Sequence, residues 1–390
     1  MFRESVDGRP NNWGSVFGGP AWTQVEDGQW YLHLFDTTQP DLDWRNPEVP
    51  TMFEDVLRFW LDRGIDGFRV DVAHGLFKEE SLRDQDVVPQ SGQTGSMVER
   101  RLHDEPMWDQ PEVHEVYRAW HEILASYDGD RMAVAEAWTQ TPESMARFVR
   151  PDELSQTFNF GWLLADWSAT TFADVIRGTL NAMAPVGVAA TWVLSNHDVI
   201  RHVTRYGGGE RGLARARAAT LTMLALPGSA YLYQGEELGL EEVDVAREDW
   251  QDPASLRTGE AGRDGCRVPI PWAGDAAPYD FGPGDGQPWI PQPDGWGQLT
   301  VDAQWDRPGS TLEFYREALR ARRTHALDAG DDVQIADGTR DTLTVVRGPL
   351  TVVLNCGDTP VPLPAGEVLV ASGPVDDKLP ADTAVWLRTG

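Results

Sequence analysis

Cysteine, basic residues and long apolar runs are all scarce in this chain of 390 residues, and each shortage excludes a class of protein. Cys266 and Cys356 are the only cysteines, which is too few for a disulfide framework, and no histidines cluster with them as metal ligands would. The 33 lysines and arginines are outnumbered by 62 acidic residues, and the net charge of −29 repels nucleic acid and anionic membranes. No stretch approaches the roughly 18 apolar residues of a membrane-spanning helix.

What is present is the composition of a globular protein. Apolar residues make up 41% of the chain and 17 residues are tryptophan, which excludes a disordered polypeptide. The length suits one large domain with a smaller one. The first residues carry no apolar signal core, so we expect a cytoplasmic protein. No residue pattern indicates a metal or a cofactor, and the oligomeric state is not indicated at all.

Three short apolar runs each lead into an acidic residue. Gly67–Val70 precedes Asp71, Met132–Ala135 precedes Glu136, and the run that begins at Trp192 reaches Asp198. These runs are too short for helices and predict buried parallel strands. Carboxylates at the carboxyl ends of such strands lie where barrel enzymes have their active sites. The interval from Glu136 to Asp198 also fits two βα units of roughly 31 residues each in a barrel of ~250 residues.

Helix patterns lie between these strands. Thr51 and Glu54 form a capping-box pattern that predicts the start of a helix, and Gly64 predicts its end. The apolar face of this helix consists of Phe53, Val56, Leu57, Trp60 and Leu61. Further helices are predicted over 113–124, 211–226 and 310–326, and further barrel strands over Thr157–Gly161 and Ser229–Tyr233.

The remaining segments have a different character. Residues 1–48 are rich in glycine, proline, asparagine and tryptophan and predict loop-dominated structure without its own core. Residues 80–110 are polar and aperiodic, and predict a long insertion on the rim of the active site. Beyond Asp328, short β runs separated by turns predict a small antiparallel β-sandwich.

Six motifs, in order along the chain, resemble one enzyme family. At these positions the chain resembles glycoside hydrolase family 13, the α-amylase family, in its α-glucosidase and oligo-1,6-glucosidase branch. A single motif of this kind is weak evidence, whereas six in sequence are strong. The motifs are Gln39–Asp43, Gly67–Ala73, Val134–Trp138, Ser195–Asp198, Leu226–Glu237 and Gly262–Trp272.

The resemblance implies a (β/α)8 TIM barrel, with a loop domain, domain B, inserted after its third strand. Strands one to three, and the Asp-x-x-Pro-Asn-His motif of the third strand, are not found ahead of Gln39. The expected fold is therefore an α/β TIM barrel lacking its first three strands. Residues 1–48 are interpreted as the C-terminal part of domain B, 49–327 as barrel strands four to eight, and 328–390 as a C-terminal antiparallel β-sandwich. On this interpretation the chain is truncated at its N-terminus.

The same resemblance assigns the three carboxylates. Asp71 corresponds to the nucleophile, Glu136 to the general acid and Asp198 to the carboxylate that stabilises the transition state. A retaining glycosidase needs one ionised and one protonated carboxyl group, about 5–5.5 Å apart. In the resembling family a valine after the nucleophile, here Val72, accompanies a preference for α-1,6 linkages.

Four basic residues are candidates for binding substrate beside these carboxylates. Arg69 is two residues before Asp71 on the same strand, so it faces the same side and keeps Asp71 ionised by charge pairing. His197 precedes Asp198 and can donate a hydrogen bond to a sugar. Arg201 and Arg205 follow closely enough to line the same pocket.

The leading hypothesis is a retaining hydrolase that releases glucose from the non-reducing end of short α-glucosides. Its partner is a small oligosaccharide or α-glucoside. One alternative is a transglycosylase of the trehalose or sucrose isomerase type, which uses the same carboxylates. The other is a truncated, non-catalytic remnant. The sequence leaves open α-1,4 against α-1,6 preference and hydrolysis against transfer.

Overall fold

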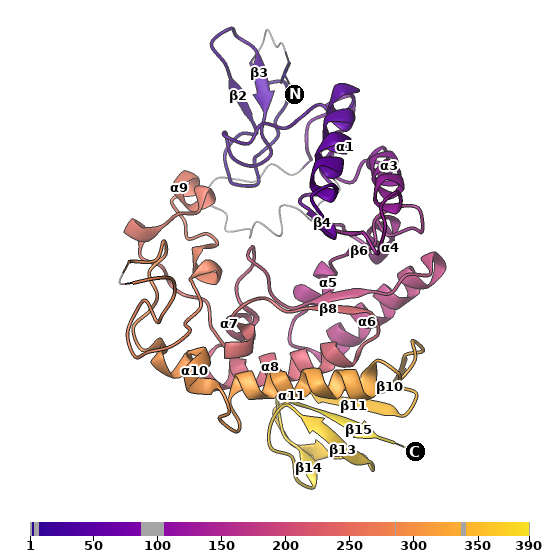
Figure 1. The fold of residues 1–390 in the computed structure, drawn as a ribbon, viewed down its shortest axis with the longest axis vertical. Helices are drawn as coiled ribbons and strands as arrows, with labels where there is room; N and C mark the ends of the chain where they lie inside the picture. Colours follow the sequence, from indigo (N-terminus) through magenta and orange to yellow (C-terminus); the bar gives the residue numbers. More distant parts are fainter. Residues whose placement is uncertain (1, 4–7, 87–104, 285, 337–340, 390) are drawn as a thin grey trace. The chain divides into compact units, whose positions relative to one another are not determined.

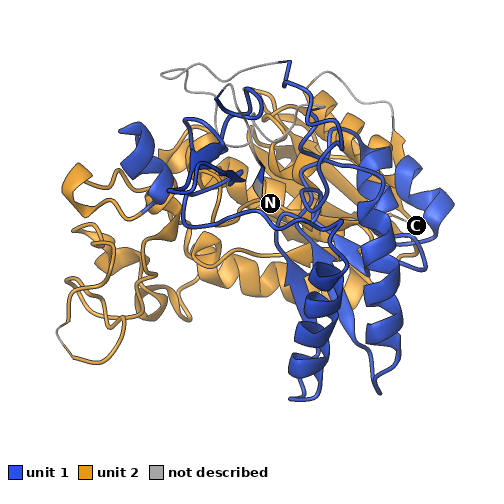
Figure 2. Ribbon diagram, turned by 90° about the horizontal axis from the view of Figure 1, so that it is seen from above, with its two compact units in different colours: residues 1–158, 181–188, 252–262 blue, residues 159–180, 189–251, 263–390 orange. Residues whose placement is uncertain are grey.

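The structure, a computed structural model, describes residues 2–3, 8–86, 105–284, 286–336 and 341–389. The chain divides into two compact units (Figure 2). Unit 1 comprises residues 1–158, 181–188 and 252–262, and unit 2 comprises residues 159–180, 189–251 and 263–390. Most of the insertion predicted over 80–110 lies outside the described residues. The predicted domain boundaries remain predictions.

The core of unit 1 is a parallel sheet in the order β4-β5-β6. Gly67 lies opposite Met132 in the register, and a Cβ on this glycine would lie 2.2 Å from the Met132 carbonyl oxygen. Only glycine therefore lets the two strands approach as they do. Helices α1 and α3 lie side by side (Figure 1). Their apolar side chains pack in the same core as Val70 and Ala135 of the sheet. The bounds are α1 Glu48–Leu61, β4 Gly67–Val70, α3 Val113–Ala125, β5 Met132–Ala135, α4 Pro142–Arg147 and β6 Gln156–Thr157.

Helix α1 begins earlier than its capping-box pattern predicts. Pro47 is the N-cap residue and makes no side-chain capping bond, whereas the hydroxyl of Thr51 donates to the Pro47 carbonyl at 3.0 Å. Proline suits a helix start because its φ is already helical. The predicted apolar face is also divided, since Leu57 and Leu61 are buried while other apolar side chains point outward. The exposed ones are Met52, Val56, Phe59 and Trp60, which are 42–47% exposed.

Residues 1–48 have a core, contrary to the sequence-based expectation. A short antiparallel sheet in the order β1-β3-β2 carries aromatic side chains that bury one another. The rings of Trp13 and Trp22 lie 6.4 Å apart, and Trp108 joins the cluster from a distant part of the chain. Aromatic side chains bury enough area for a few of them to stabilise a small loop-rich segment. The strands are β1 Phe2–Arg3, β2 Trp22–Gln24 and β3 Trp30–Leu32.

Unit 2 contains a second parallel pair, β7 and β8, which brings the described parallel strands to five. The strand predicted over Thr157–Gly161 is wrong beyond Thr157, because Asn159 caps a short helix by accepting from the Trp162 N–H at 3.1 Å. The elements are α5 Phe160–Leu163, α6 Ala169–Met183, η1 Ala184–Val186, β7 Thr191–Val193, α7 His202–Arg205, α8 Gly209–Ala225, β8 Ser229–Tyr231, η2 Glu236–Leu238, η3 Arg247–Asp249, α9 Pro253–Thr258, η4 Asp264–Arg267, η5 Trp296–Leu299, α10 Val301–Gln304, α11 Thr311–Ala321 and η6 Arg322–Ala326. Of these, η1 and α9 fall in unit 1, and α6 extends into it.

The end of the chain forms a five-stranded antiparallel sheet, in the order β13-β15-β11-β10-β9, and a two-stranded sheet β12-β14. Val353 and Val385 of the larger sheet share a core with Leu379 of the smaller one. Trp386 donates from its indole N–H to the carbonyl of Leu221 on α8 at 3.0 Å, which fixes the larger sheet to that helix. The strands are β9 Gln334–Ala336, β10 Thr342–Arg347, β11 Leu350–Asn355, β12 Val361–Pro362, β13 Glu367–Ala371, β14 Lys378–Leu379 and β15 Thr383–Arg388. Across the described chain, no helix is both long enough and apolar enough to cross a membrane.

Candidate active site

Asp71 and Glu136 follow neighbouring strands at the same end of the sheet in unit 1. Val70 pairs with Ala135 in the parallel register, so the next residue of each strand is acidic. The ladder continues past the strand ends, because the Glu136 N–H donates to the Val70 carbonyl at 2.9 Å and the Ala73 N–H donates to the Glu136 carbonyl at 2.8 Å. The backbone thus fixes both carboxylates at one edge of the sheet.

The Glu136 carboxylate is buried and held at both oxygens. Its side chain is 2% exposed. Oε2 accepts the Val72 N–H at 2.7 Å, and Oε1 accepts the indole N–H of Trp138. A buried carboxylate needs such donors, since burial without them is costly. Its orientation is therefore set by the turn after β4 and by its own strand exit.

Arg69 joins the two carboxylates. Its guanidinium donates to Asp71 Oδ1, and Nη2 lies 3.8 Å from Glu136 Oε2. The Asp71 side chain is 69% exposed, so this carboxylate faces solvent while Glu136 does not. The structure therefore brings three of the predicted residues together, with one cation between one exposed and one buried carboxylate.

Asp198 follows β7 in unit 2 and is also surrounded by cations. Oδ1 accepts from Arg263 Nη1 at 2.8 Å and from Arg267 Nη2 at 3.2 Å, and His197 Nε2 lies 3.7 Å away. Asn196 shapes the turn, because its side-chain oxygen accepts the N–H groups of Asp198 and of the residue after it. The Asp198 carboxylate is consequently both buried and charge-compensated.

Arg263 and Arg267 were not identified from the sequence as site residues. They belong to the segment Gly262–Trp272, whose motif indicates the family but does not by itself indicate a role for its arginines. Arg267 also donates to the His197 carbonyl at 2.8 Å, so it holds the backbone of the β7 exit as well as the carboxylate. The available signal was the presence of two arginines four residues apart inside a recognised motif.

Arg201 and Arg205 have different surroundings. Arg201 is 2% exposed, and its guanidinium donates to the carbonyls of Gln234 and Cys266, each at 2.9 Å. Arg205 donates to the carbonyls of Ile200 and of the residue that follows β7. The guanidinium of Arg205 therefore holds the backbone that follows β7, and that of Arg201 holds the backbone that follows β8 and the backbone of η4.

His202 and Glu236 form a buried pair near the turn that follows β7. The His202 ring is 2.7 Å from the Ser195 hydroxyl and 3.6 Å from a carboxyl oxygen of Glu236. Burial, together with Arg205 and Arg201, lowers the pKa of His202 from 6.5 to about 3. Burial and Glu237 raise the pKa of Glu236 well above 4.5. In the folded protein the histidine is therefore neutral above about pH 3, and the glutamic acid keeps its proton to a pH well above 4.5.

This pair predicts an unusual pH dependence of stability. Between pH 4.5 and 6.5, for as long as Glu236 keeps its proton in the folded protein, the folded pair carries one proton and the unfolded pair also carries one, on His202. The contribution of the pair to the free energy of unfolding is then flat. Above pH 6.5 the unfolded pair carries none, so stability falls with rising pH until Glu236 has lost its proton in the folded protein as well. Below pH 4.5 the unfolded pair carries two and stability falls with falling pH.

Glu236→Gln should remove the plateau. Without the carboxyl proton, the variant should lose stability from pH 6.5 downward at about 1.4 kcal/mol per pH unit, and should no longer lose it above pH 6.5 through this pair. Urea denaturation followed by tryptophan fluorescence at pH 4.5, 5.5, 6.5 and 7.5 measures the difference. Because other groups titrate equally in both proteins, parallel curves for wild type and variant would contradict the assignment.

Most of the chain is similar in sequence to known proteins. A sequence model of the alpha amylase catalytic domain matches residues 2–330. A salivary alpha-glucosidase of Anopheles gambiae is 32% identical over 390 residues, covering 93% of this chain and 64% of the relative. A probable alpha-glucosidase of Rhizobium meliloti is 34% identical over 349 residues, covering 86% and 62%. The chain thus spans slightly less than two thirds of the length of these curated relatives.

Solved structures agree on the fold. An alpha-glucosyl transfer enzyme has a TM-score of 0.84 at 31% identity, covering 100% of this chain and 77% of that one. The trehalulose synthase MutB has a TM-score of 0.83 at 25% identity, again covering 100% and 77%. The fold is that of a TIM barrel enzyme with a C-terminal β-sheet domain.

Proposed function

Because the chain belongs to the alpha-amylase family, we propose that it is a retaining glycoside hydrolase that releases glucose from the non-reducing end of short α-glucosides. The observation that carries the proposal is the placement of Arg69 between Asp71 and Glu136 at two adjacent strand ends. A retaining mechanism requires such a pair, with one carboxylate ready to attack and another able to hold a proton. The two relatives are named as a salivary alpha-glucosidase and a probable alpha-glucosidase, which supports the same substrate class.

Asp71 is proposed as the nucleophile and Glu136 as the general acid. Asp71 attacks the anomeric carbon and forms a glucosyl ester, while Glu136 gives its proton to the departing oxygen. Glu136 then takes a proton from water, the water attacks the ester, and Asp71 is released. Arg69 pairs with the Asp71 carboxylate and holds it in place. The difference in exposure fits the roles, since the attacking group meets the sugar and the acid is shielded from bulk water.

Asp198 is proposed as the third carboxylate, which hydrogen-bonds sugar hydroxyls as positive charge develops on the ring. His197 is proposed as a neighbouring donor. Arg263 and Arg267 compensate the charge of Asp198 and fix its position. Arg201 and Arg205 are proposed to act through the backbone that they hold, after β8 and in η4 for Arg201 and after β7 for Arg205, rather than on the sugar.

We further propose that β4 to β8 are strands four to eight of the barrel, that residues 1–48 belong to domain B and that residues 328–390 form the β-sandwich. Activity should then need the first three strands. An eight-stranded form can be made by joining barrel strands one to three of an alpha-amylase family enzyme ahead of this chain. An in-frame extension upstream of Met1 that contains Asp-x-x-Pro-Asn-His would supply the same segment naturally.

The test is hydrolysis of maltose and p-nitrophenyl α-glucoside by the eight-stranded form. Nuclear magnetic resonance of the first product should show α-glucose, because two displacements restore the starting configuration. β-Glucose as the first product would exclude a retaining mechanism. Turnover that survives the loss of Asp71 would exclude the assigned nucleophile.

A transfer reaction is the second candidate, and the similarity to an alpha-glucosyl transfer enzyme and to a trehalulose synthase favours it. Both candidates share the glucosyl ester and differ in what attacks it. Sucrose separates them. A hydrolase yields glucose and fructose in equal amounts, whereas an isomerase yields a new disaccharide with little free glucose.

Linkage preference gives a further prediction. Val72 follows the nucleophile directly, and its resemblance to α-1,6-acting relatives leads us to expect faster hydrolysis of isomaltose than of maltose. Small changes in side-chain bulk are worth ~1–3 kcal/mol in discrimination, which corresponds to roughly 10- to 200-fold in kcat/KM. Val72→Ala should shift the ratio towards maltose. Equal kcat/KM values for the two sugars in the wild type would contradict this expectation.

A further inference from the structure

The turn after Asp71 has an unfavourable backbone conformation. Val72 has φ = 48°, in the left-handed region that β-branched residues almost never adopt. In this conformation its N–H points to Glu136 Oε2 at 2.7 Å. The residue after the nucleophile thereby sets the orientation of the buried carboxylate. A conformation that costs energy persists only when surrounding groups enforce it.

Those surrounding groups come from the segment that precedes α3. The rings of His74 and Trp108 stack with centroids 4.9 Å apart, and the Asp109 N–H donates to the His74 carbonyl at 2.7 Å. Gly75 makes this fit possible, because a Cβ there would lie 2.8 Å from both Trp108 and Val72. Trp108 and Asp109 therefore close over the turn and hold it in place.

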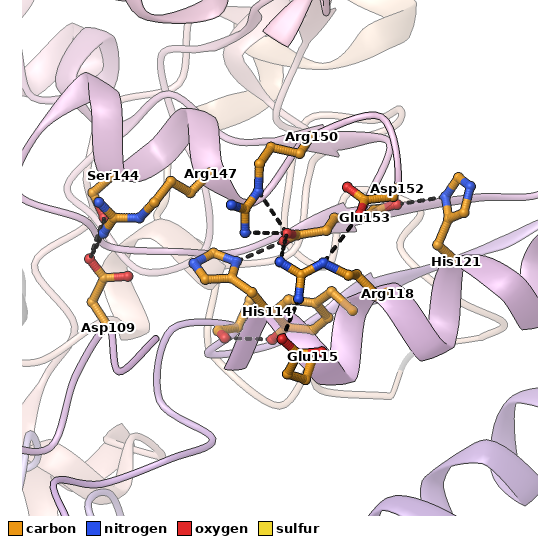
Figure 3. Close-up of polar contacts among 12 residues, drawn as sticks. Asp109, His114, Glu115, Arg118, His121, Ser144, Arg147, Arg150, Asp152 and Glu153 are labelled. Atoms are coloured by element: carbon orange, nitrogen blue, oxygen red, sulfur yellow. Dashed lines mark hydrogen bonds and ion pairs between the residues drawn. The ribbon is translucent and has the colours of Figure 1, made fainter. Parts of the chain in front are cut away.

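Asp109 is in turn anchored to the helix that follows Glu136. Its Oδ2 accepts from the Ser144 hydroxyl and from Arg147 Nη2, the latter at 2.9 Å (Figure 3). Arg147 also donates to the Ser144 hydroxyl at 2.9 Å. Both belong to α4, whose first turn is capped by the Thr141 hydroxyl. A rigid, capped helix is thus connected through one carboxylate to the strained turn.

We propose that Asp109 is a positioning residue for the reaction: by linking α4 to the turn at 72–75, it maintains the relative placement of Asp71 and Glu136. This inference rests on the proposed function. Asp109 links the two strand exits indirectly, because its N–H donates to the turn after β4 and its carboxylate accepts from α4. The Val72 N–H links them directly by donating to Glu136. An error of about 1 Å in such a placement can cost roughly 100-fold in rate.

A neighbouring polar cluster supplies a matched comparison. Glu153 is buried and accepts from His114 and Arg150, with Arg118 Nη2 3.5 Å away (Figure 3). Asp152 lies at the edge of that cluster, is 62% exposed and accepts from Arg118 at 3.2 Å. It belongs to the same polar region of α3 and α4, but none of its described contacts reaches the turn at 72–75. Asp152→Asn is therefore the control for a change of charge alone.

The experiment compares Asp109→Ala and Asp109→Asn with Asp152→Asn in the eight-stranded form. We expect Asp109→Ala to lower kcat about 100-fold with KM changed less than about twofold, because alignment is lost and sugar binding is not. Asp109→Asn should recover part of the loss, since its side-chain oxygen still accepts from Ser144. Asp152→Asn should leave kcat unchanged. All values are normalised to the number of sites that form a covalent adduct with a mechanism-based glucosidase inactivator.

A second measurement does not depend on turnover. Hydrogen exchange by mass spectrometry should show faster exchange of the peptide covering residues 71–75 in Asp109→Ala, and unchanged exchange in Asp152→Asn. If Asp109→Ala fails to fold, Arg147→Gln removes one donor and should lower kcat several-fold. A wild type without turnover would overturn the proposed function. If the wild type is active but every folded variant of Asp109 and Arg147 has the same kcat as Asp152→Asn, this inference is overturned and the proposed function stands.

Discussion

Asp71→Asn is expected to lower turnover of α-glucosides by roughly four orders of magnitude or more, the loss typical of removing a nucleophile. An amide has nearly the shape of the carboxylate but cannot form the glucosyl ester. It also removes one negative charge beside Arg69, but the Asp71 side chain is 69% exposed and the carboxylate of Glu136 remains 3.8 Å from Arg69, so the fold should tolerate the change. The measurement is kcat on p-nitrophenyl α-glucoside in the eight-stranded form, with circular dichroism to confirm the fold.

Asp66→Asn provides the control for this change. Asp66 precedes the same strand, β4, at its opposite end, where its side chain is 92% exposed and pairs with Arg131 at 2.6 Å. Exposed pairs of this kind contribute little to stability, so this variant should keep both its fold and its turnover. An Asp71→Asn enzyme with more than about 1% of wild-type kcat would contradict the assignment of the nucleophile.

The 390-residue chain expressed alone is expected to turn over many orders of magnitude more slowly than the eight-stranded form. In the family, the third strand supplies an aspartate and a histidine that bind hydroxyls of the sugar under attack. Loss of positioning and of charge stabilisation together is costly even when the carboxylates are present. Both forms are assayed on p-nitrophenyl α-glucoside at equal protein concentration. Ordinary turnover by a soluble monomer of the shorter chain would contradict the expectation.

Self-association of the shorter chain should accompany its low activity. The exposed face of α1, defined by Met52, Val56, Phe59 and Trp60, is contiguous along one helix, and β4 is one of the two edge strands of its sheet among the described residues. Exposed apolar patches and open strand edges both favour association. Phe59→Glu should reduce association in analytical ultracentrifugation without restoring turnover. This variant separates the two effects.

Local patterns predict the strands around the site well, because β4, β5 and β7 are short apolar runs with a turn before each and an acidic residue after it. They fail where the deciding interaction is a cap or a distant ring. Asn159 ends the predicted strand at Thr157 by capping a helix, and Pro47 starts α1 a turn ahead of Thr51. The core of residues 1–48 needs Trp108, which no local pattern could place there.

In the candidate site, too, local patterns predict the contacts between residues close in sequence and miss those between distant ones. Arg69 and Asp71 are two residues apart on a strand, so the alternation of side chains is sufficient to pair them. Arg263 and Arg267 reach Asp198 across 65 and 69 residues of chain. Proximity in sequence, by contrast, is the only reason to expect Arg201 and Arg205 in the pocket. The carbonyl groups that accept from Arg201 belong to Gln234 and Cys266, which no local pattern associates with it, whereas those that accept from Arg205 lie 5 and 11 residues away in the chain.

The bond between Trp386 and Leu221 also has a consequence during protein synthesis. The two residues are 165 positions apart, so α8 leaves the ribosome long before the strand that covers it. At ~5–20 residues per second, the interval is roughly 10–30 s. Throughout that time the face of α8 around Leu221 lacks its final partner, and the cell's chaperones have access to it. Unit 2 therefore completes its folding only after β15 has been translated, so codons that slow the ribosome between α8 and β15 prolong the vulnerable period.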